Sequence, residues 1–452
     1  MFEVDYVEAP GGGEPPARTG APKAAEVLAF ATSLGGSFDG LDDAERIDLI
    51  RALEVAKGAA EGAQATVTVD FDTSQRTKAA ARGVAPERQG RGIAHQLALA
   101  RRESPHRGQR HLGLAKVLAT EMPHTLAALR EGRITEWKAT LLARETACLS
   151  LEDRRRIDRE LAGNAEGIEQ MGDRELAGQA SKRAAELDPE SVAARRSKAE
   201  ADRHVSVRPA PDTMTWLGAH LSVKHGVSVY AALKAEADRL ILTGDGRSRG
   251  QIMADTLVAR VLDPAITTTG APAVPIRVNV VISLDSLLAE TDDGAAIPGY
   301  GPIPAATVRD WIREGLAAGV QVELRRLFAS PDTGQLVAME SGSRAFPATL
   351  AEFIELRDQR CRTPWCDAPI RHADHVQAAA DGGPTSAANG QGLCESCNYA
   401  KEAIGWDAHP RPGPGHEVET VTPTGHTYLS RAGMAVPPTS QERRLADLIW
   451  AA

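Results

Sequence analysis

The sequence predicts an α+β protein, with a mainly helical N-terminal domain that contains some strands and a small metal-binding module near the C-terminus. Apolar residues recur at helical spacing through most of residues 24–203, whereas apolar and polar residues alternate at 214–221 and 278–284. Four of the five cysteines lie within residues 361–397. One tight cluster in a long chain is typical of a metal site rather than of a disulfide scaffold.

The composition is that of a globular protein with few aromatic side chains. The chain has 452 residues, enough for two or three domains, and its hydrophobic content of 42% is ordinary. Its net charge of −9 excludes a uniformly basic coat for nucleic acid but allows a local basic patch. No apolar stretch approaches the roughly 18 residues that span a bilayer, and the first residues lack a signal-peptide pattern. We therefore expect a cytoplasmic protein with no membrane partner.

The first elements are predicted from composition and from helix-capping signals. Residues 1–23 are rich in Gly, Pro and Glu, and we expect a disordered tail because such a segment buries little apolar surface. A helix is predicted to start near Leu41, where acidic residues precede an apolar stripe. Ser104 followed by Pro105 indicates another helix start. The short helices between 104 and 149 resemble a helix-turn-helix cluster, a pattern that many helical bundles share.

The second half of this domain, which we expect to extend over residues 24–345, mixes helices and strands. The elements expected in order are helices at 173–187 and 189–203, a strand at 214–221, helices at 229–242 and 248–262, a strand at 278–284 and a hairpin at 322–341. Residues 263–276 and 292–305 are rich in Pro, Gly, Thr and Ala, which predicts loops.

The cysteine cluster has the spacing of a structural zinc site. Cys394 and Cys397 have the Cys-x-x-Cys spacing of a zinc knuckle. Cys361 and Cys366 are further apart, and the proline between them suits a tight turn. Four cysteine ligands leave no open coordination position, so we expect this zinc to be structural. The alternative, four unrelated buried cysteines, does not explain the clustering.

A second group of residues in this segment is not explained by a structural zinc. It comprises Asp374-His375, Gly382-Gly383, Asn389, and the Cys-Asn-x-x-Lys ending that contains Asn398 and Lys401. Together with the cysteine pairs, these residues resemble the zinc-bearing HNH endonucleases. Asn398 stands where the family name has a histidine, which makes this sequence a His-Asn-Asn variant.

The resemblance to HNH endonucleases covers residues 361–406 and implies a ββα-metal module with a treble-clef-like core. We expect this nuclease domain at residues 350–410, followed by a Pro/Gly-rich extension at 411–452. The implied activity is that of a hydrolase that cleaves DNA phosphodiester bonds. RNA as substrate stays open, and so does a catalytically inactive zinc-bearing protein that only binds nucleic acid.

The same resemblance implies a role for each residue of the second group. His375 would be the general base that activates water. Asp374 and Asn398 would hold a catalytic magnesium or manganese ion, since both ions prefer oxygen ligands. Asn389 would brace the loop that orients His375, and Lys401 would contact a phosphate oxygen. The alternatives are a helix cap for Asn398 and a solvent-exposed side chain for Lys401.

The N-terminal region resembles the domain-of-unknown-function-222 family over about residues 25–345. The resemblance rests on the segments that begin Ser104-Pro-His-Arg, Met122-Pro-His-Thr, Leu187-Asp-Pro-Glu, Gly299-Tyr-Gly-Pro and Ser330-Pro-Asp-Thr-Gly. This family often precedes an HNH module. It implies an order of domains but no activity for the N-terminal domain.

The basic residues are concentrated away from the cysteine cluster. Residues 75–112 hold nine Lys or Arg and two acidic residues, a net charge of +7, whereas residues 353–406 have a net charge of −2. One hypothesis is that the basic stretch supplies the phosphate contacts to DNA. The other is a solvated basic helix face. Since cutting both strands needs two centres or two encounters, a homodimer is a further possibility.

Overall fold

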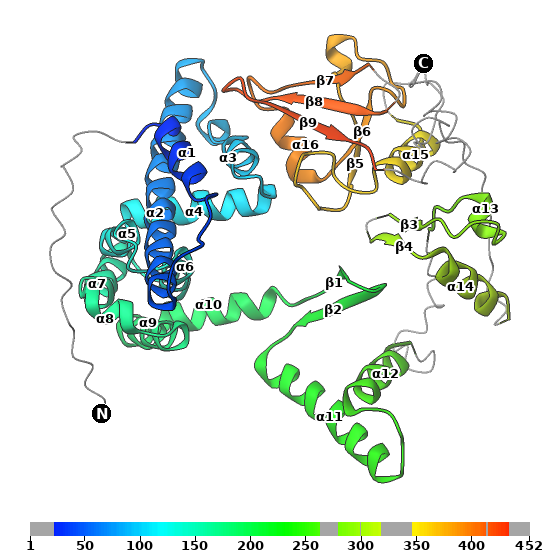
Figure 1. The fold of residues 1–452 in the computed structure, drawn as a ribbon, viewed down its shortest axis with the longest axis horizontal. Helices are drawn as coiled ribbons and strands as arrows, with labels where there is room; N and C mark the ends of the chain where they lie inside the picture. Colours follow the sequence, from blue (N-terminus) through cyan, green and yellow to red (C-terminus); the bar gives the residue numbers. More distant parts are fainter. Residues whose placement is uncertain (1–21, 263–278, 299, 318–345, 413–414, 434–452) are drawn as a thin grey trace. The chain divides into compact units, whose positions relative to one another are not determined.

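A computed structural model describes residues 22–262, 279–298, 300–317, 346–412 and 415–433. Outside these residues lie the hairpin expected at 322–341 and the loop expected at 263–276. Residues 1–21 of the tail expected at 1–23 also lie outside them. Within the described part the fold is α+β, as predicted: helices predominate, and the strands form small antiparallel sheets (Figure 1). The chain divides into two compact units, residues 1–56 and 57–452.

The first unit holds helix α1 (Ala24–Ser33) and the start of the long helix α2 (Asp43–Ala81), which continues into the second unit. Asp42 and Glu45 begin α2 with reciprocal hydrogen bonds from each backbone amide to the other's carboxylate, at 2.8 and 2.9 Å. This capping box satisfies two amides that the helix itself leaves unpaired. The acidic signal after Leu41 therefore predicted the correct start of the helix.

Short helices after α2 build an apolar core in the second unit. They are η1 (Pro86–Arg88), α3 (Ile93–Arg101), α4 (Pro105–Thr120), α5 (Pro123–Arg130), α6 (Glu136–Glu145), α7 (Leu151–Ala162), α8 (Ala165–Gln170), α9 (Asp173–Leu187) and α10 (Pro189–Ala201). Five of these helices contribute Leu118, Leu129, Leu142, Ile157 and Leu176 to one buried cluster. Burying each such side chain contributes about 2 kcal/mol to folding.

Two local features fix helix α4 against its neighbour α3. The Ser104 side chain accepts a hydrogen bond from the Arg107 amide at 3.5 Å, so Ser104 caps α4 as predicted. Gly108 lies in the first turns of α4, where a Cβ atom would be only 2.3 Å from the Ala94 carbonyl oxygen of α3. The two helices cross closely because this position has no side chain.

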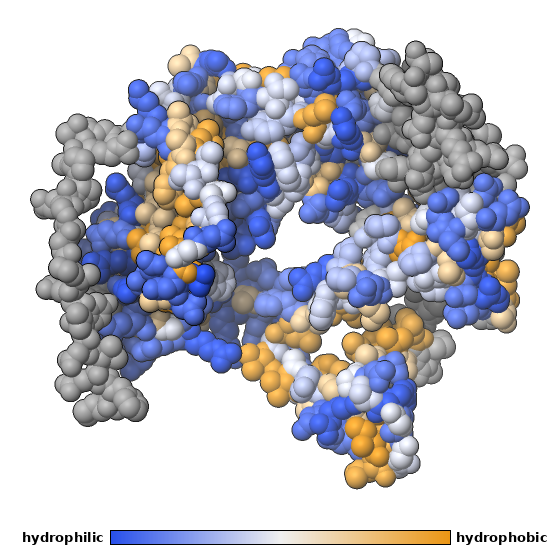
Figure 2. Space-filling model, viewed as in Figure 1, coloured by the Kyte–Doolittle hydropathy of each residue, from blue (hydrophilic) through white to orange (hydrophobic). Residues whose placement is uncertain are grey.

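Two hairpins and several helices make up the described part of residues 204–317. Strands β1 (His204–Ala210) and β2 (Met214–His220) pair antiparallel, as do β3 (Ala295–Ile297) and β4 (Gly301–Ile303). The helices are α11 (Val223–Leu242), α12 (Arg249–Leu262), α13 (Leu284–Leu287) and α14 (Ala305–Ala317). The expected strand at 214–221 and helices at 229–242 and 248–262 are confirmed. Apolar side chains are exposed along α11, and Figure 2 shows hydrophobic patches on this part of the surface. Val223 and Leu242 are two of these exposed side chains.

Two predictions for this region are wrong. Residues 292–305, predicted to be a loop, contain β3 and β4, because a short hairpin tolerates Gly and Pro where a longer strand does not. The strand predicted at 278–284 is reduced, within the described residues, to a bridge between Val281 and Ala296, and Leu284 already begins α13. A short apolar run does not by itself specify a strand.

The C-terminal module contains two strands and a helix in the order expected for a ββα unit. After α15 (Ala348–Asp358), strand β5 (His372–His375) is followed by η3 (Ala379–Asp381), β6 (Gly390–Leu393) and α16 (Glu395–Lys401). β5 and β6 are antiparallel and pair His375 with Gly390.

A three-stranded antiparallel sheet follows the ββα unit. Its strands are β7 (Asp407–Arg411), β8 (Glu417–Val421) and β9 (Thr427–Arg431), in the order β7-β8-β9. Strands β8 and β9 thus lie within the segment expected to be a Pro/Gly-rich extension. Among the described residues, no helix combines the length and apolarity that crossing a membrane requires.

Candidate functional site

The structure brings the four clustered cysteines together as one buried group. Their ligand atoms all lie within 4.8 Å of one another. The Cys366 sulfur is 3.9 Å from that of Cys394 and 3.8 Å from that of Cys397. A tetrahedral zinc ion with sulfur ligands at about 2.3 Å requires sulfur atoms about 3.8 Å apart. The geometry is therefore compatible with zinc binding.

Local backbone features present these sulfur atoms to a common centre. Cys394 is the residue before α16, and its sulfur accepts a hydrogen bond from the Cys397 amide at 3.4 Å. Trp365, just before Cys366, adopts a left-handed backbone conformation with φ of 59°, which closes the tight turn of the first pair. Hydrogen bonds from the other thiols, the strongest from Cys361, lower the pKa of the Cys394 thiol. This favours the thiolate form that binds metal.

His375 lies at the end of β5 with its ring held from two sides. Its side chain is buried, and Nε2 is 2.9 Å from the Thr385 hydroxyl oxygen. The Phe346 ring lies beside it, with ring centroids 4.6 Å apart. His375 is the last residue of β5 and Asp374 precedes it, and Lys401 of α16 contacts both, so the two residues lie together at this end of the strand.

Asn389 fixes the loop that connects β5 to β6. Its side-chain oxygen accepts from the Gln377 amide at 2.9 Å, and its Nδ2 donates to the carbonyl oxygens of Gln377 and Pro384 at 3.0 and 2.9 Å. Gly383 is required beside it, because a Cβ atom there would lie 2.0 Å from the Gln377 carbonyl oxygen. Asn389 thus closes the loop immediately after His375.

Lys401 reaches back from the last turn of α16 to strand β5. Its ammonium forms an ion pair with Asp374 and donates a hydrogen bond to the His375 carbonyl oxygen. The Lys401 side chain is only 14% exposed, which does not fit the alternative of a solvent-exposed side chain. The sequence could not predict this ion pair, because it depends on how α16 packs against β5.

The oxygen donors of the site suit a hard divalent cation. Asp374 offers a partly exposed carboxylate, and the positive charge of Lys401 already lies against it. Asn398, in the first turn of α16, offers an amide oxygen, and within the described residues its side chain makes no hydrogen bond or ion pair with Asp374. Carboxylate and amide oxygens are the ligands that magnesium and manganese prefer. These residues therefore fit such an ion.

A buried ion pair near the site was not predicted from the sequence. Arg357 and Asp358, at the end of α15, are each 2% exposed and form a bond of 2.7 Å between Nε and Oδ1. Arg357 also donates to the carbonyl oxygens of Ala387 and Gly390, and Asp358 accepts from the Gly392 amide. The pair thereby attaches α15 to β6. The sequence feature that could have indicated this pair is the two adjacent, oppositely charged residues at the end of a helix with apolar residues.

Arg362 connects the same ion pair to the C-terminal sheet. Its Nη2 donates to the carbonyl oxygens of His416 and Ser430, both at 3.0 Å, and its side chain is buried. Burial lowers the pKa of Arg362 to about 10, despite the opposing effect of Asp358. Burial is also the main reason why the pKa of His416 is lowered to about 4, and the charge of Arg357 adds to it. His416 is therefore neutral near pH 7.

Comparison with known proteins identifies two families along the chain. The domain of unknown function DUF222 matches residues 50–358, and the HNH endonuclease domain matches residues 359–403. The HNH match contains the whole cysteine cluster and all of the second residue group described above. Searches of curated proteins and of solved structures found no match.

Proposed function

From the premise that the chain belongs to the DUF222 family and carries an HNH endonuclease domain, we propose that it is a metal-dependent endonuclease that hydrolyses DNA phosphodiester bonds. The observation that carries this proposal is the arrangement at the end of β5. There His375 is held by Thr385, while Asp374 faces the last turn of α16. A base and an oxygen ligand on neighbouring residues are what hydrolysis of a phosphodiester requires.

His375 acts in this proposal as the general base. It takes a proton from the attacking water, for which an imidazole is suited near neutral pH. Thr385 and Phe346 restrict the ring to one orientation, and Asn389 restrains the loop that leaves His375. A base held in this way needs little reorganisation before it accepts the proton.

Asp374 and Asn398 would hold the magnesium or manganese ion. When bound, this ion neutralises charge on the scissile phosphate and on the leaving oxygen. Lys401 is paired with the Asp374 carboxylate, so its ammonium would compete with the ion for this ligand. Released from Asp374, Lys401 would be available to contact a phosphate oxygen.

The zinc ion bound by the four cysteines would be structural, and the DNA contacts would come largely from residues 75–112. Within the described residues, Arg76 bonds Asp72 at 2.9 Å and Arg101 bonds Gln64. The other basic side chains of this stretch are exposed, and in the described part of the chain they make no hydrogen bond or ion pair. Because the chain has one such centre, cleavage of both strands would require a second copy or a second encounter.

The test is cleavage of supercoiled plasmid by the zinc-loaded full chain with magnesium or manganese. His375→Ala should lower the rate by about a hundredfold or more, the usual effect of removing a general base. His372→Ala is the matched control, since it removes another histidine of β5. Equal rates for both variants would contradict the role of His375. Binding without cleavage by the unmodified chain would favour the alternative, an inactive nucleic-acid-binding protein, and a parallel RNA substrate tests the choice of nucleic acid.

A further inference from the structure

A charged pocket lies among α2, α3, α4 and α6, away from the residues assigned to the nuclease centre. Its volume is about 420 Å³, and its lining includes Arg101, Arg107, Arg110, His111 and Trp137. Small-molecule sites in proteins have volumes of about 300–1,000 Å³. The pocket is therefore large enough for one nucleotide.

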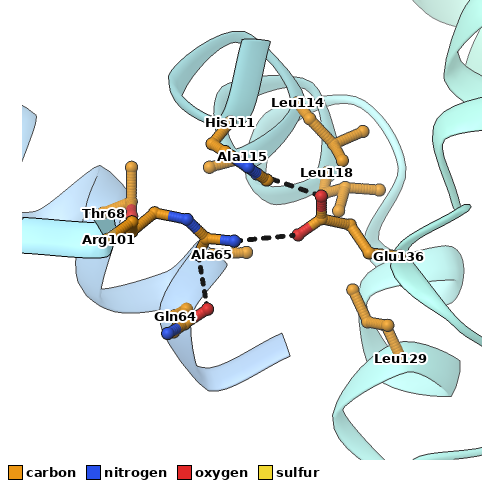
Figure 3. Close-up of a pocket in the computed structure, with 10 residues that line it drawn as sticks. All are labelled: Gln64, Ala65, Thr68, Arg101, His111, Leu114, Ala115, Leu118, Leu129 and Glu136. Atoms are coloured by element: carbon orange, nitrogen blue, oxygen red, sulfur yellow. Dashed lines mark hydrogen bonds and ion pairs between the residues drawn. The ribbon is translucent and has the colours of Figure 1, made fainter. Parts of the chain in front are cut away.

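The floor of the pocket is a paired network of charges. His111 lies between two carboxylates, with Nε2 2.9 Å from Glu103 and Nδ1 3.0 Å from Glu136. Arg101 hydrogen-bonds Gln64 and forms an ion pair with Glu136, both marked in Figure 3. The distance between Arg101 Nη2 and Glu136 Oε2 is 3.8 Å. Next to this network is a space of about 10 Å³, lined by both polar and apolar side chains, with room for about one water molecule. The network thus closes the base of the pocket.

The acidic groups of the pocket are engaged by the protein itself. The third carboxylate, that of Glu61, accepts the Glu136 amide at 2.8 Å and so caps α6. Burial alone would raise the pKa of Glu136, but His111 and Arg101 outweigh it and the pKa is lowered. Glu136 therefore stays ionised and paired with His111 and Arg101.

The rim carries two guanidinium groups without a close acidic partner among the described residues, although the charge of Arg110 contributes to the lowered pKa of Glu136. Arg107 and Arg110 are exposed, lie one turn apart on α4, and make no side-chain hydrogen bond or ion pair within the described part of the chain. Guanidinium groups at this spacing can bind one phosphate with planar, directed hydrogen bonds. Trp137, on the first turn of α6, lines the same pocket and is 48% exposed. An exposed indole offers a flat surface on which a base can stack.

We propose that this pocket binds a nucleotide, with its phosphate on Arg107 and Arg110 and its base against Trp137. The nucleotide is either one unit of a single-stranded nucleic acid or a free nucleotide. The site belongs to the DUF222 part of the chain, and its existence does not depend on whether His375 catalyses cleavage.

The test measures binding in a zinc-loaded full-length His375→Ala protein, so that a failure of catalysis does not affect it. The probes are a fluorescein-labelled twelve-residue oligothymidylate, followed by anisotropy, and thymidine 5′-monophosphate as competitor. Arg107→Glu with Arg110→Glu should weaken oligonucleotide binding by about tenfold or more. Arg174→Glu with Lys198→Glu makes the same change in charge outside both the pocket and residues 75–112, and should weaken it by less than about threefold. Both pairs are exposed, and unchanged melting temperatures would confirm that the variants are folded.

Trp137 supplies the second measurement. Trp137→Ala should weaken binding by about tenfold, whereas Trp137→Phe, which keeps an aromatic face, should retain most of it. Competition by the mononucleotide would identify a free nucleotide as a ligand, and binding of the oligonucleotide alone would identify a strand. Equal losses for the two charge-reversed pairs, no effect of Trp137→Ala, or no binding of either probe would overturn the proposal.

Discussion

Lys401 is the site residue whose surroundings differ most from those predicted from the sequence. The sequence indicated a phosphate contact or a solvated side chain, yet the ammonium is largely buried against Asp374 and the His375 carbonyl oxygen. The ammonium neutralises the charge of Asp374, which the proposed function assigns as a ligand of the catalytic ion. Under that proposal, Lys401 and the ion would compete for the same carboxylate.

Replacing Lys401 should therefore separate metal binding from catalysis. In Lys401→Met, manganese should bind about tenfold more tightly, equivalent to about 1.4 kcal/mol, because no ammonium has to be displaced. Cleavage should nevertheless slow, because the phosphate contact is lost. Free manganese is measured by electron paramagnetic resonance in the zinc-loaded chain. Arg371→Met, which removes a positive charge from an exposed side chain of the same module, should leave affinity nearly unchanged. Unchanged or weaker binding in Lys401→Met would show that the lysine does not compete.

His416 gives the C-terminal module a specific dependence on pH. Its pKa is lowered to about 4 in the folded chain from 6.5, chiefly by burial and then by the charge of Arg357. Asp358 opposes the shift, and Arg362 adds to it. The folded state thus binds fewer protons than the unfolded state. The stabilising effect is complete above pH 6.5 and is lost as the pH falls towards 4.

The expected loss for His416 is about 2 kcal/mol of unfolding free energy between pH 8 and pH 5. His416→Gln should remove this part of the pH dependence while its amide can still donate to the Ala388 carbonyl oxygen. Urea unfolding of both proteins at the two pH values measures the difference. Acid also protonates the zinc ligands in both proteins, so only the difference between them is informative, and parallel pH profiles would contradict the assignment.

At the scale of elements, one buried carboxylate connects helices α7 and α5. Asp158 is fully buried, and it accepts hydrogen bonds from the amides of His124 and Thr125 at 2.8 and 2.9 Å and from the Thr125 hydroxyl at 2.6 Å. These amides belong to the first turn of α5, where backbone amides have no hydrogen-bond acceptor within the helix itself. Asp158 is thus an N-terminal cap supplied by a distant helix.

Asp158→Ala should destabilise the chain by about 3 kcal/mol, since it leaves buried donors without acceptors. Glu152→Ala is the matched control on the same helix: Glu152 is exposed and, among the described residues, its side chain makes no hydrogen bond or ion pair, so its loss should cost less than about 0.5 kcal/mol. Denaturant unfolding measures both. A similar small loss in the two variants would show that α5 does not depend on Asp158.

The same elements show how far the sequence could specify the fold. Local sequence signals predicted correctly the features that depend on neighbouring residues alone. Examples are the Ser104 cap of α4 and the Cys-x-x-Cys motif at the start of α16. These signals failed for β3 and β4, which are three-residue strands too short for a period-two pattern. They also missed Asp158 and the Arg357–Asp358 pair. The hydrogen-bond partners of these groups lie more than 30 residues away in the sequence. Hydrophobic periodicity describes only local structure, so it cannot predict such contacts.

At the scale of the whole molecule, the two families along the chain predict two separable folding processes. The helical core around Leu118 and Leu142 is apolar, whereas the buried group around the cysteines consists mainly of the four thiols. Because this group has little apolar surface of its own, the fold around the thiols would depend on the proposed zinc ion for stability. Zinc loss should therefore unfold the HNH module and leave the helical core intact.

Cys397→Ser tests this separation directly. The variant should lose the zinc ion and expose the HNH module to limited proteolysis, while the helical fragment stays resistant and retains its thermal transition. Cys148→Ser, outside the cluster, should keep both zinc and protection, as should His375→Ala. Zinc content by atomic absorption and the protease-resistant fragments by mass spectrometry are the two measurements. If Cys397→Ser kept its zinc, the four-cysteine site would be wrong. If it lost zinc and the helical core unfolded with it, the two regions would be one cooperative unit.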